Sequence, residues 1–161
     1  MTNSALLQVT ASGEVELWRP GQVGLLPASN LRVLLETQAL SELTDLFGGQ
    51  LPLDATAQAQ GVLSGAPRNF RLDEIFFEAS GAILKVSGTG RMEHIGSEEG
   101  LWLDLETKAE TSSLARFTDA YGLIVPIDGS ASASARVWGG RGQVRVDDID
   151  AEVIAQSASL R

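Results

Sequence analysis

The residues of this chain with the greatest chemical potential are its one histidine and a short acidic cluster. His94 could act as a general base, but no nucleophile that it could activate is evident in the sequence. Asp147, Asp148 and Asp150 could bind calcium, but a calcium loop normally adds a glycine turn and a spaced acidic ligand, which are missing here. We therefore interpret His94 as a solvated loop residue and the aspartates as the solvent-facing edge of a strand.

A third candidate is the segment Gly88-Thr89-Gly90, which weakly resembles a phosphate-binding loop. Such loops lead into a helix whose N-terminus holds the phosphate, and no helical pattern follows here. Small residues in a tightly curved strand explain the segment better. The tryptophans Trp18, Trp102 and Trp138 fall on strands or strand ends, where packing is favoured over a ligand cage. The sequence thus predicts no catalytic residue, no metal site and no cofactor, so the chain is not expected to be an enzyme.

Composition narrows the class of protein. The 161 residues contain 43% hydrophobic and 20% charged residues, typical of a folded domain. The formal net charge of −9 and the scattered basic residues argue against binding to nucleic acid or to an anionic membrane surface. With no cysteine, disulfides and thiolate chemistry are excluded. The N-terminal residues do not resemble a signal peptide, and no apolar run reaches the ~20 residues of a membrane span.

An internal repeat is the most informative feature. Pro52 and Pro126 lie 74 positions apart, and so do Asp54 and Asp128. The same offset relates further identical pairs: Gly48 and Gly122, Arg71 and Arg145, Asp73 and Asp147, Ile75 and Ile149, Glu78 and Glu152. Self-similarity at a fixed period is the signature of repeat architectures. We therefore predict a repeat protein.

The edges of the repeat suggest how the chain is divided. Residues 35–37 match residues 105–107 at an offset of 70, which suggests four extra residues before the second helix, and residues 5–13 resemble 82–90 at an offset of 77. We predict one repeat-array fragment over residues 1–161. Its parts are the end of a preceding unit (1–30), a first unit (31–93) and a truncated second unit (100–161). The fragment would then belong to a longer array.

Hydrophobic periodicity predicts mainly β structure. Most of the chain alternates apolar and polar residues with period two, as at Leu101, Leu103 and Leu105, which is typical of strands in an antiparallel sheet with one apolar face. Two short segments instead follow helical spacing, residues 40–47 and 114–121, each ending at a glycine, with Ser112 or Ser113 able to cap the second. We expect eight or nine strands and two short helices. Two such helices cannot cover so many strands, so the sheet must either close as a sandwich or barrel, or curl into an open trough.

The segment from Ser113 to Val137, followed by Gln143 to Val153, resembles the AsmA-like repeat. In that family a short helix ending in a Leu-Pro step leads into small-residue strands, and Leu40 to Gly65 with Phe70 to Gly90 match the pattern again. The resemblance covers roughly residues 30 to 161. The membrane anchor of the family is absent from this sequence.

The resemblance implies a function. AsmA-like proteins are anchored in the inner membrane of Gram-negative bacteria, and their periplasmic repeats form a curled β-sheet with an apolar interior linked to phospholipid movement to the outer membrane. On this basis we expect a non-enzymatic, periplasmic segment with an antiparallel repeat sheet, an open trough or twisted sandwich, that binds phospholipid or another acyl lipid and joins further repeats of the same chain. The candidate lipid-facing residues are Leu7, Val9, Leu72, Leu84, Val86, Leu101, Leu103, Leu105, Ala133, Val137, Val144 and Val146.

Two alternatives remain open. The first is a structural or adhesive β-repeat domain, in which two facing sheets close over a dry core and function lies on the polar face. The second is a hydrolase on a β-sandwich, which requires a convergent polar cluster that the sequence does not offer. Neither the lipid nor any protein partner in the envelope is identified by the sequence.

Overall fold

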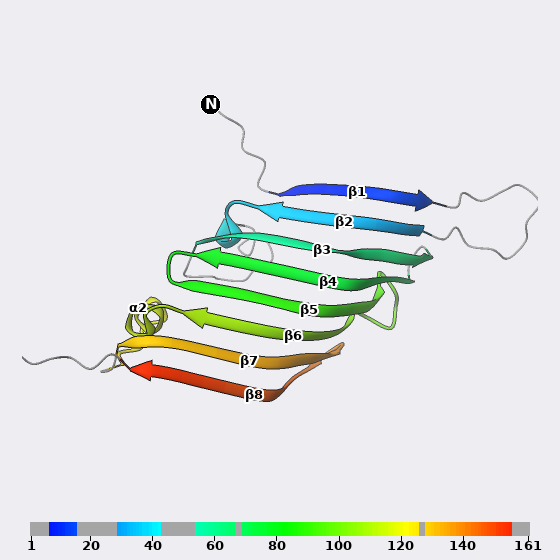
Figure 1. The fold of residues 1–161 in the computed structure, drawn as a ribbon. Coiled ribbons are helices and arrows are strands. Elements are labelled where there is room, and N and C mark those ends of the chain that lie inside the picture. Colours follow the sequence, from blue (N-terminus) through cyan, green and yellow to red (C-terminus); the bar gives the residue numbers. More distant parts are fainter. Residues whose placement is uncertain (1–6, 16–28, 43–53, 67–68, 126–127, 156–161) are drawn as a thin grey trace, which may run out of the picture.

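The computed structural model describes residues 7–15, 29–42, 54–66, 69–125 and 128–155. Within them the chain forms one antiparallel sheet of eight strands and a short helix (Figure 1). The elements are β1 (Gln8–Val15), β2 (Ser29–Thr37), β3 (Ala55–Ala66), β4 (Asn69–Gly81), β5 (Leu84–Ile95), β6 (Trp102–Thr111), α2 (Leu114–Ala120), β7 (Gly129–Gly140) and β8 (Gln143–Ala155). Residues 40–42 are also helical, and the rest of the first predicted helix lies outside the described residues.

The sheet is an open meander. Its strands follow one another in chain order from β1 to β8, and each pairs antiparallel with the next. Figure 1 shows the strands side by side in one layer, with α2 at one end of the sheet beside β6 and β7. The predicted fold class, a mainly β protein built on an open antiparallel sheet, is confirmed. Of the two predicted forms, the described residues adopt the open one, with no second sheet facing the first.

The 74-residue repeat is present in the distortions of the backbone. The β3–β4 ladder shifts register between Gln60 and Val62, and the β7–β8 ladder shifts between Ser134 and Arg136, 74 positions later. Two non-glycine residues with the same offset, Glu74 and Asp148, both adopt positive φ, 52° and 53°. L-residues seldom adopt this conformation, so its recurrence is specific. Strands β3 and β4 are therefore equivalent to β7 and β8.

The predicted offset of 70 at the start of the helices is wrong. Thr37 pairs with Ala57, and Thr111 pairs with Ala131, so the structural equivalents are again 74 apart. Both threonines are buried, and the Oγ1 of each accepts a hydrogen bond from the backbone N–H two residues later. The second unit has no extra residues before its helix. Residues 35–37 and 105–107 are similar short strings, but they do not occupy equivalent positions in the two units.

Helix α2 is held by capping groups. Ser113, one of the two predicted caps, accepts a hydrogen bond at Oγ from the N–H of Arg116 at 3.2 Å and donates from Oγ to Asp128 Oδ1 at 3.0 Å. Asp128 also accepts from the N–H groups of Gly129 and Ala115. These bonds, that from Gly129 first, hold the pKa of Asp128 below its ordinary value. Asp128 thus ties the start of α2 to the start of β7.

The described residues contain almost no conventional core. Ile75 and Ile83 are the buried hydrophobic residues among them, and no large side chain there is fully buried. A single layer of strands leaves each face open, so cross-strand side-chain pairs supply most of the packing. Apolar groups that a second layer would otherwise cover remain exposed to solvent.

Candidate functional site: the apolar face of the sheet

One face of the sheet is apolar across all eight strands except at Thr37, Thr107 and Thr111. Residues directly opposite one another in an antiparallel ladder share a face, so the register identifies its members. One row runs from Leu35 through Ala59 and Phe77, and the next from Ala57 through Ala79, Val86, Ala109 and Ala133 to Ala151. Further rows join Ile75, Gly90, Leu105, Val137 and Val146, and Leu63, Leu72, Met92, Leu103, Gly139 and Val144. We call this surface the apolar face.

Large side chains on the apolar face lie over glycines of neighbouring strands. A Cβ atom at Gly88 would approach the Phe77 ring to 2.6 Å, so the ring covers the backbone of β5 at that point. Leu72 lies against Gly61 in the same way, and Leu105 against Gly90. The glycines leave room for these side chains to lie against the sheet. The resulting surface is low and apolar, and it is not filled by interdigitated side chains.

A groove of about 670 Å³ lies over β1 to β5 at the end of the sheet where β2 leads into helical residues 40–42. This volume falls within the range of small-molecule sites. Its apolar lining is Leu7, Leu35, Leu40, Ala55, Ala57, Ala59, Phe77, Ala79, Ala82, Ile83, Leu84 and Val86. Thr37 and Asp54 add polar groups, whereas Glu36, Gln58 and Glu78 also border the groove but share a row with Ser87, so their side chains lie on the opposite face. The groove therefore offers an apolar floor with polar groups at its margin.

The predicted lipid-facing residues mostly lie together. Strand positions on the apolar face are occupied by Val9, Leu72, Leu84, Val86, Leu103, Leu105, Ala133, Val137, Val144 and Val146. Leu7 precedes β1 and lines the groove. The prediction is wrong for Leu101, which lies in the loop before β6, because that strand begins at Trp102.

The sequence prediction missed several groove residues. Leu35, Ala57, Ala59 and Phe77 line the groove but were not among the predicted positions. The alternation of Leu31, Val33 and Leu35 and the run of alternate alanines from Ala55 contained the signal. Ile83 and Leu40 carry no such signal, because they lie outside the strands.

The opposite face of the sheet is covered by charged side chains. Arg136 on β7 forms a two-pronged pair with Asp104 on β6, with nitrogen–oxygen distances of 2.8 and 2.9 Å. Lys85 lies 2.9 Å from Glu78, whose hydrogen bond raises the pKa of Lys85. Trp102 lies beneath Arg91, at 5.5 Å from the ring centroid, and Trp138 lies similarly beneath Arg145. We call this the polar face; Trp102 and Trp138 pack in the way that the sequence predicted, and Trp18 lies outside the described residues.

Acidification should weaken the fold through Asp104. The hydrogen bond from Arg136, followed by the charges of Arg136 and Arg91, lowers the pKa of Asp104 below 3.8. A carboxylate whose pKa is lowered by folding stabilises the fold above its unfolded pKa, and that contribution is lost as the pH falls through the folded pKa. We expect the difference in Tm between wild type and Asp104→Asn, equivalent to at most about 1 kcal/mol, to disappear between pH 5 and pH 2. Thermal unfolding followed by circular dichroism measures it, and a difference independent of pH would contradict this role.

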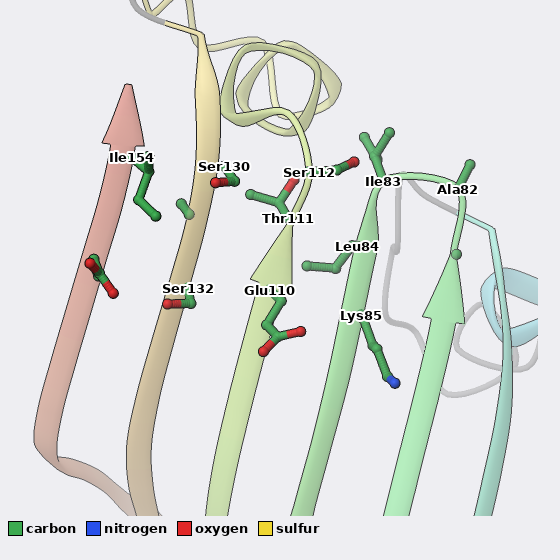
Figure 2. A pocket seen from close by; sticks show the side chains of 13 residues that line it. Ala82, Ile83, Leu84, Lys85, Glu110, Thr111, Ser112, Ser130, Ser132 and Ile154 are labelled. Carbon is green, nitrogen blue, oxygen red and sulfur yellow. The ribbon is translucent and has the colours of Figure 1, made fainter. Parts of the chain in front are cut away.

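The polar face has a shallow hollow of about 410 Å³ near α2. Figure 2 shows Lys85, Glu110 and Ser132 at one level on three neighbouring strands, with Thr111, Ser112 and Ser130 closer to the helix. Lys108 also lies beside Glu110, and this ion pair lowers the pKa of the Glu110 carboxyl. Two charged groups of the hollow, Lys85 and Glu110, are thus paired with residues outside its lining, Glu78 and Lys108. In the described ranges, no three residues of metal-binding type come together as a ligand set.

His94 departs from the prediction, whereas the acidic cluster follows it. His94 lies at the end of β5, with φ of 59° and Nδ1 3.1 Å from Glu99 Oε2, and is only partly exposed, so its prediction as a solvated loop residue is wrong. The acidic cluster lies on the exposed edge strand β8, as predicted. There Asp147 accepts a hydrogen bond from Trp138 Nε1 at 2.6 Å, and Asp148 forms the bulge. Asp147 and Asp148 therefore have structural roles.

No family model, curated protein or solved structure matches this chain. The AsmA-like resemblance therefore stays a prediction from the sequence motifs. Within the part of the chain that the structure describes, none of the helical segments has the length and apolar character needed to cross a bilayer.

Proposed function

We propose that the apolar face binds the acyl chains of phospholipids, and that the chain is a non-enzymatic segment of an AsmA-like lipid-transport protein. One observation carries the proposal. An apolar surface continues across eight strands, and the described residues provide no layer that covers it. Exposed apolar patches of this extent mark interaction or ligand sites in soluble proteins.

The physical chemistry of the surface suits an acyl chain. Removing each CH₂ group from water contributes about 0.8 kcal/mol, so a chain lying along the rows of alanine, valine and leucine would be held along its length. The groove over β1 to β5 is a place where such a chain could begin to bind. Neighbouring rows are chemically alike, so a chain could shift from one row to the next without crossing a large barrier. The ion pairs of the polar face keep the other side of the sheet in water.

A closed-core structural or adhesive domain is less well supported. That alternative requires a facing sheet whose side chains interdigitate with the apolar face, and the described residues form a single layer. The glycine positions beneath Phe77 and Leu105 keep the surface flat, which suits a flexible ligand. A hydrolase would need a convergent polar cluster beside the groove, whereas the polar groups there are spread along its margin.

The resemblance extends the proposal to location and partners. The full-length protein would be anchored in the inner membrane and would extend through the periplasm, with further repeats continuing the sheet. Phospholipid is the proposed ligand, in support of outer-membrane biogenesis.

Site-specific photocrosslinking tests the proposed ligand. A photoreactive amino acid at Val86 would lie on the apolar face, and the same residue at Ser87 would lie on the polar face of the same strand. We expect lipid adducts at position 86 and about tenfold fewer at position 87, both in cells and with purified protein in phospholipid vesicles. Mass spectrometry of the adducts identifies the lipid. Equal adduct yields at the two positions, or none at either, would count against the proposal.

A further inference from the structure

The two edge strands of the sheet expose apolar side chains and backbone hydrogen-bonding groups that are covered or paired in the interior strands. In the described residues, β1 and β8 each pair on one side only. Every residue of β8 is exposed, and Ile149 has 68% of its surface accessible. Its equivalent in β4, Ile75, has 5%. The difference arises because β4 has β5 beside it, whereas β8 has no such neighbour among the described strands.

The repeat makes the two edges complementary. Strand β8 is equivalent to β4 at the offset of 74, as the paired bulges show. Strand β1 is equivalent to β5 at the offset of 77, because Val9 pairs with Leu35 as Val86 pairs with Ala109, and 35 and 109 are themselves 74 apart. The free side of β8 therefore corresponds to the side of β4 that binds β5. The free side of β1 corresponds to the side of β5 that binds β4.

We propose that β8 of one copy of this chain pairs antiparallel with β1 of a second copy, in the register of β4 with β5. Transferring the six consecutive pairs from Ile75 to Ser80 by the two offsets gives these expected partners: Ile149 with Gly13, Asp150 with Ser12, Ala151 with Ala11, Glu152 with Thr10, Val153 with Val9, and Ile154 with Gln8. In this register, each residue of β8 on the apolar face lies opposite an apolar residue or glycine of β1. The apolar face would continue unbroken from one copy into the next.

Both edges already have the backbone conformation that this pairing needs. Glu74 and Asp148 adopt the same positive φ at the bulges of the β3–β4 and β7–β8 ladders, so β8 already has the backbone bend that β4 has where it pairs with β5. Gly13 has φ of 145° where Gly90 has 155°. Little rearrangement is required on association, which lowers the cost of forming the interface.

One charge in the expected interface is unfavourable. Glu14 is equivalent to Arg91, and Arg91 lies opposite the Asp73–Glu74 bulge of β4. In the second copy Glu14 would therefore lie opposite Asp147 and Asp148. Like charges facing one another across strands are destabilising. Association should be weak at low ionic strength, and it should strengthen when position 14 becomes basic.

The pairing is head to tail, because it joins two different edges. Such a contact does not close on itself and generates an extended assembly. Eight strands at the usual inter-strand spacing would add about 38 Å per copy. A following repeat of a longer chain would occupy the same edge of β8 in the same register, so the test below uses the 161-residue chain, in which this edge pairs with no other described strand.

Cysteine pairing tests the register, and the native chain contributes no cysteine to interfere. Protein with Thr10→Cys is mixed with protein with Glu152→Cys and oxidised. Opposed residues in antiparallel strands lie about 4.5–5.5 Å apart between Cα atoms, within disulfide range. We expect a covalent dimer from this mixture, and about tenfold less from Thr10→Cys with Arg145→Cys, which lies about 23 Å further along the strand. Equal yields from the two mixtures, or no dimer from either, would overturn the proposal.

A gain-of-function variant keeps the proposal testable if disulfide geometry is poor. We expect Glu14→Arg to lower the dissociation constant of the dimer about two- to fivefold in sedimentation at low salt. The difference between this variant and wild type should shrink as salt is added. The matched variant Glu98→Arg, in the exposed turn between β5 and β6, should leave association unchanged. A monomer at every concentration for both wild type and Glu14→Arg would overturn the proposal. Lipid binding is measured separately, so either result leaves the proposed function to its own test.

Discussion

Replacing Val86 by aspartate should reduce phospholipid binding by about tenfold or more, because an ionised carboxylate cannot be placed against an acyl chain without a large desolvation cost. Val86 lies in the middle of the apolar face, between Ala79 of β4 and Ala109 of β6, and it lines the groove. These alanines are too short to shield the new charge. Binding is measured by the transfer of a fluorescent phospholipid from vesicles to purified protein.

The control is Ser87→Asp, which adds the same charge to the next residue of the same strand. Ser87 lies opposite Lys108 on the polar face, where a carboxylate remains in water beside a cation. We expect lipid transfer within about twofold of wild type for this variant, since an exposed charge pair changes free energies by less than about 1 kcal/mol. Equal loss of transfer in both variants, with unchanged circular dichroism, would show that net charge matters and that the apolar face does not bind the lipid.

Leu103→Asp extends the same measurement to β6. Leu103 pairs with Met92 and Gly139 in a row of the apolar face that lies outside the groove of β1 to β5. If the ligand travels along the whole face, this variant should slow transfer about as strongly as Val86→Asp. Loss at Val86 with normal transfer at Leu103 would restrict the binding site to the groove.

The faces of the sheet could be predicted from the sequence because alternation translates directly into side-chain direction. Leu103, Leu105, Ala133 and Val137 share the apolar face for that reason alone. Ser113 was predictable as a helix cap from its residue type and its position before an apolar helical pattern. The prediction failed at Leu101, where the alternation continues in sequence although the strand has not yet begun.

Other features depend on tertiary pairing, which no local pattern contains. The correct offset of 74 between Thr37 and Thr111 depends on their partners, Ala57 and Ala131. The sequence alone favoured the match of residues 35–37 with 105–107, whose offset is 70. The bulges at Glu74 and Asp148 place non-glycine residues at positive φ, which no propensity predicts. Whether the sheet would close or stay open likewise depended on long-range arrangement.

Replacing Ile75 by alanine should lower the free energy of unfolding by about 2–4 kcal/mol, because it removes a nearly buried side chain from the middle of the sheet. Only 5% of the surface of Ile75 is accessible to solvent. Ile75 lies opposite Gly90, which has no side chain to fill the space left behind. Few other hydrophobic residues among those described are buried, so the loss falls on a small core. Urea unfolding followed by circular dichroism measures the change.

The repeat provides a matched control for that prediction. Ile149 occupies the equivalent position in β8 and has 68% of its surface exposed, so Ile149→Ala should change the stability of the isolated chain by less than about 0.5 kcal/mol. The two effects should converge if copies associate through β8 and β1, because pairing would place Gly13 opposite Ile149 as Gly90 lies opposite Ile75. Ile149→Ala would then weaken association at high protein concentration while leaving dilute protein unaffected. Equal destabilisation by both variants in dilute solution would mean that β8 is already covered, and that its edge is not free to bind a second copy.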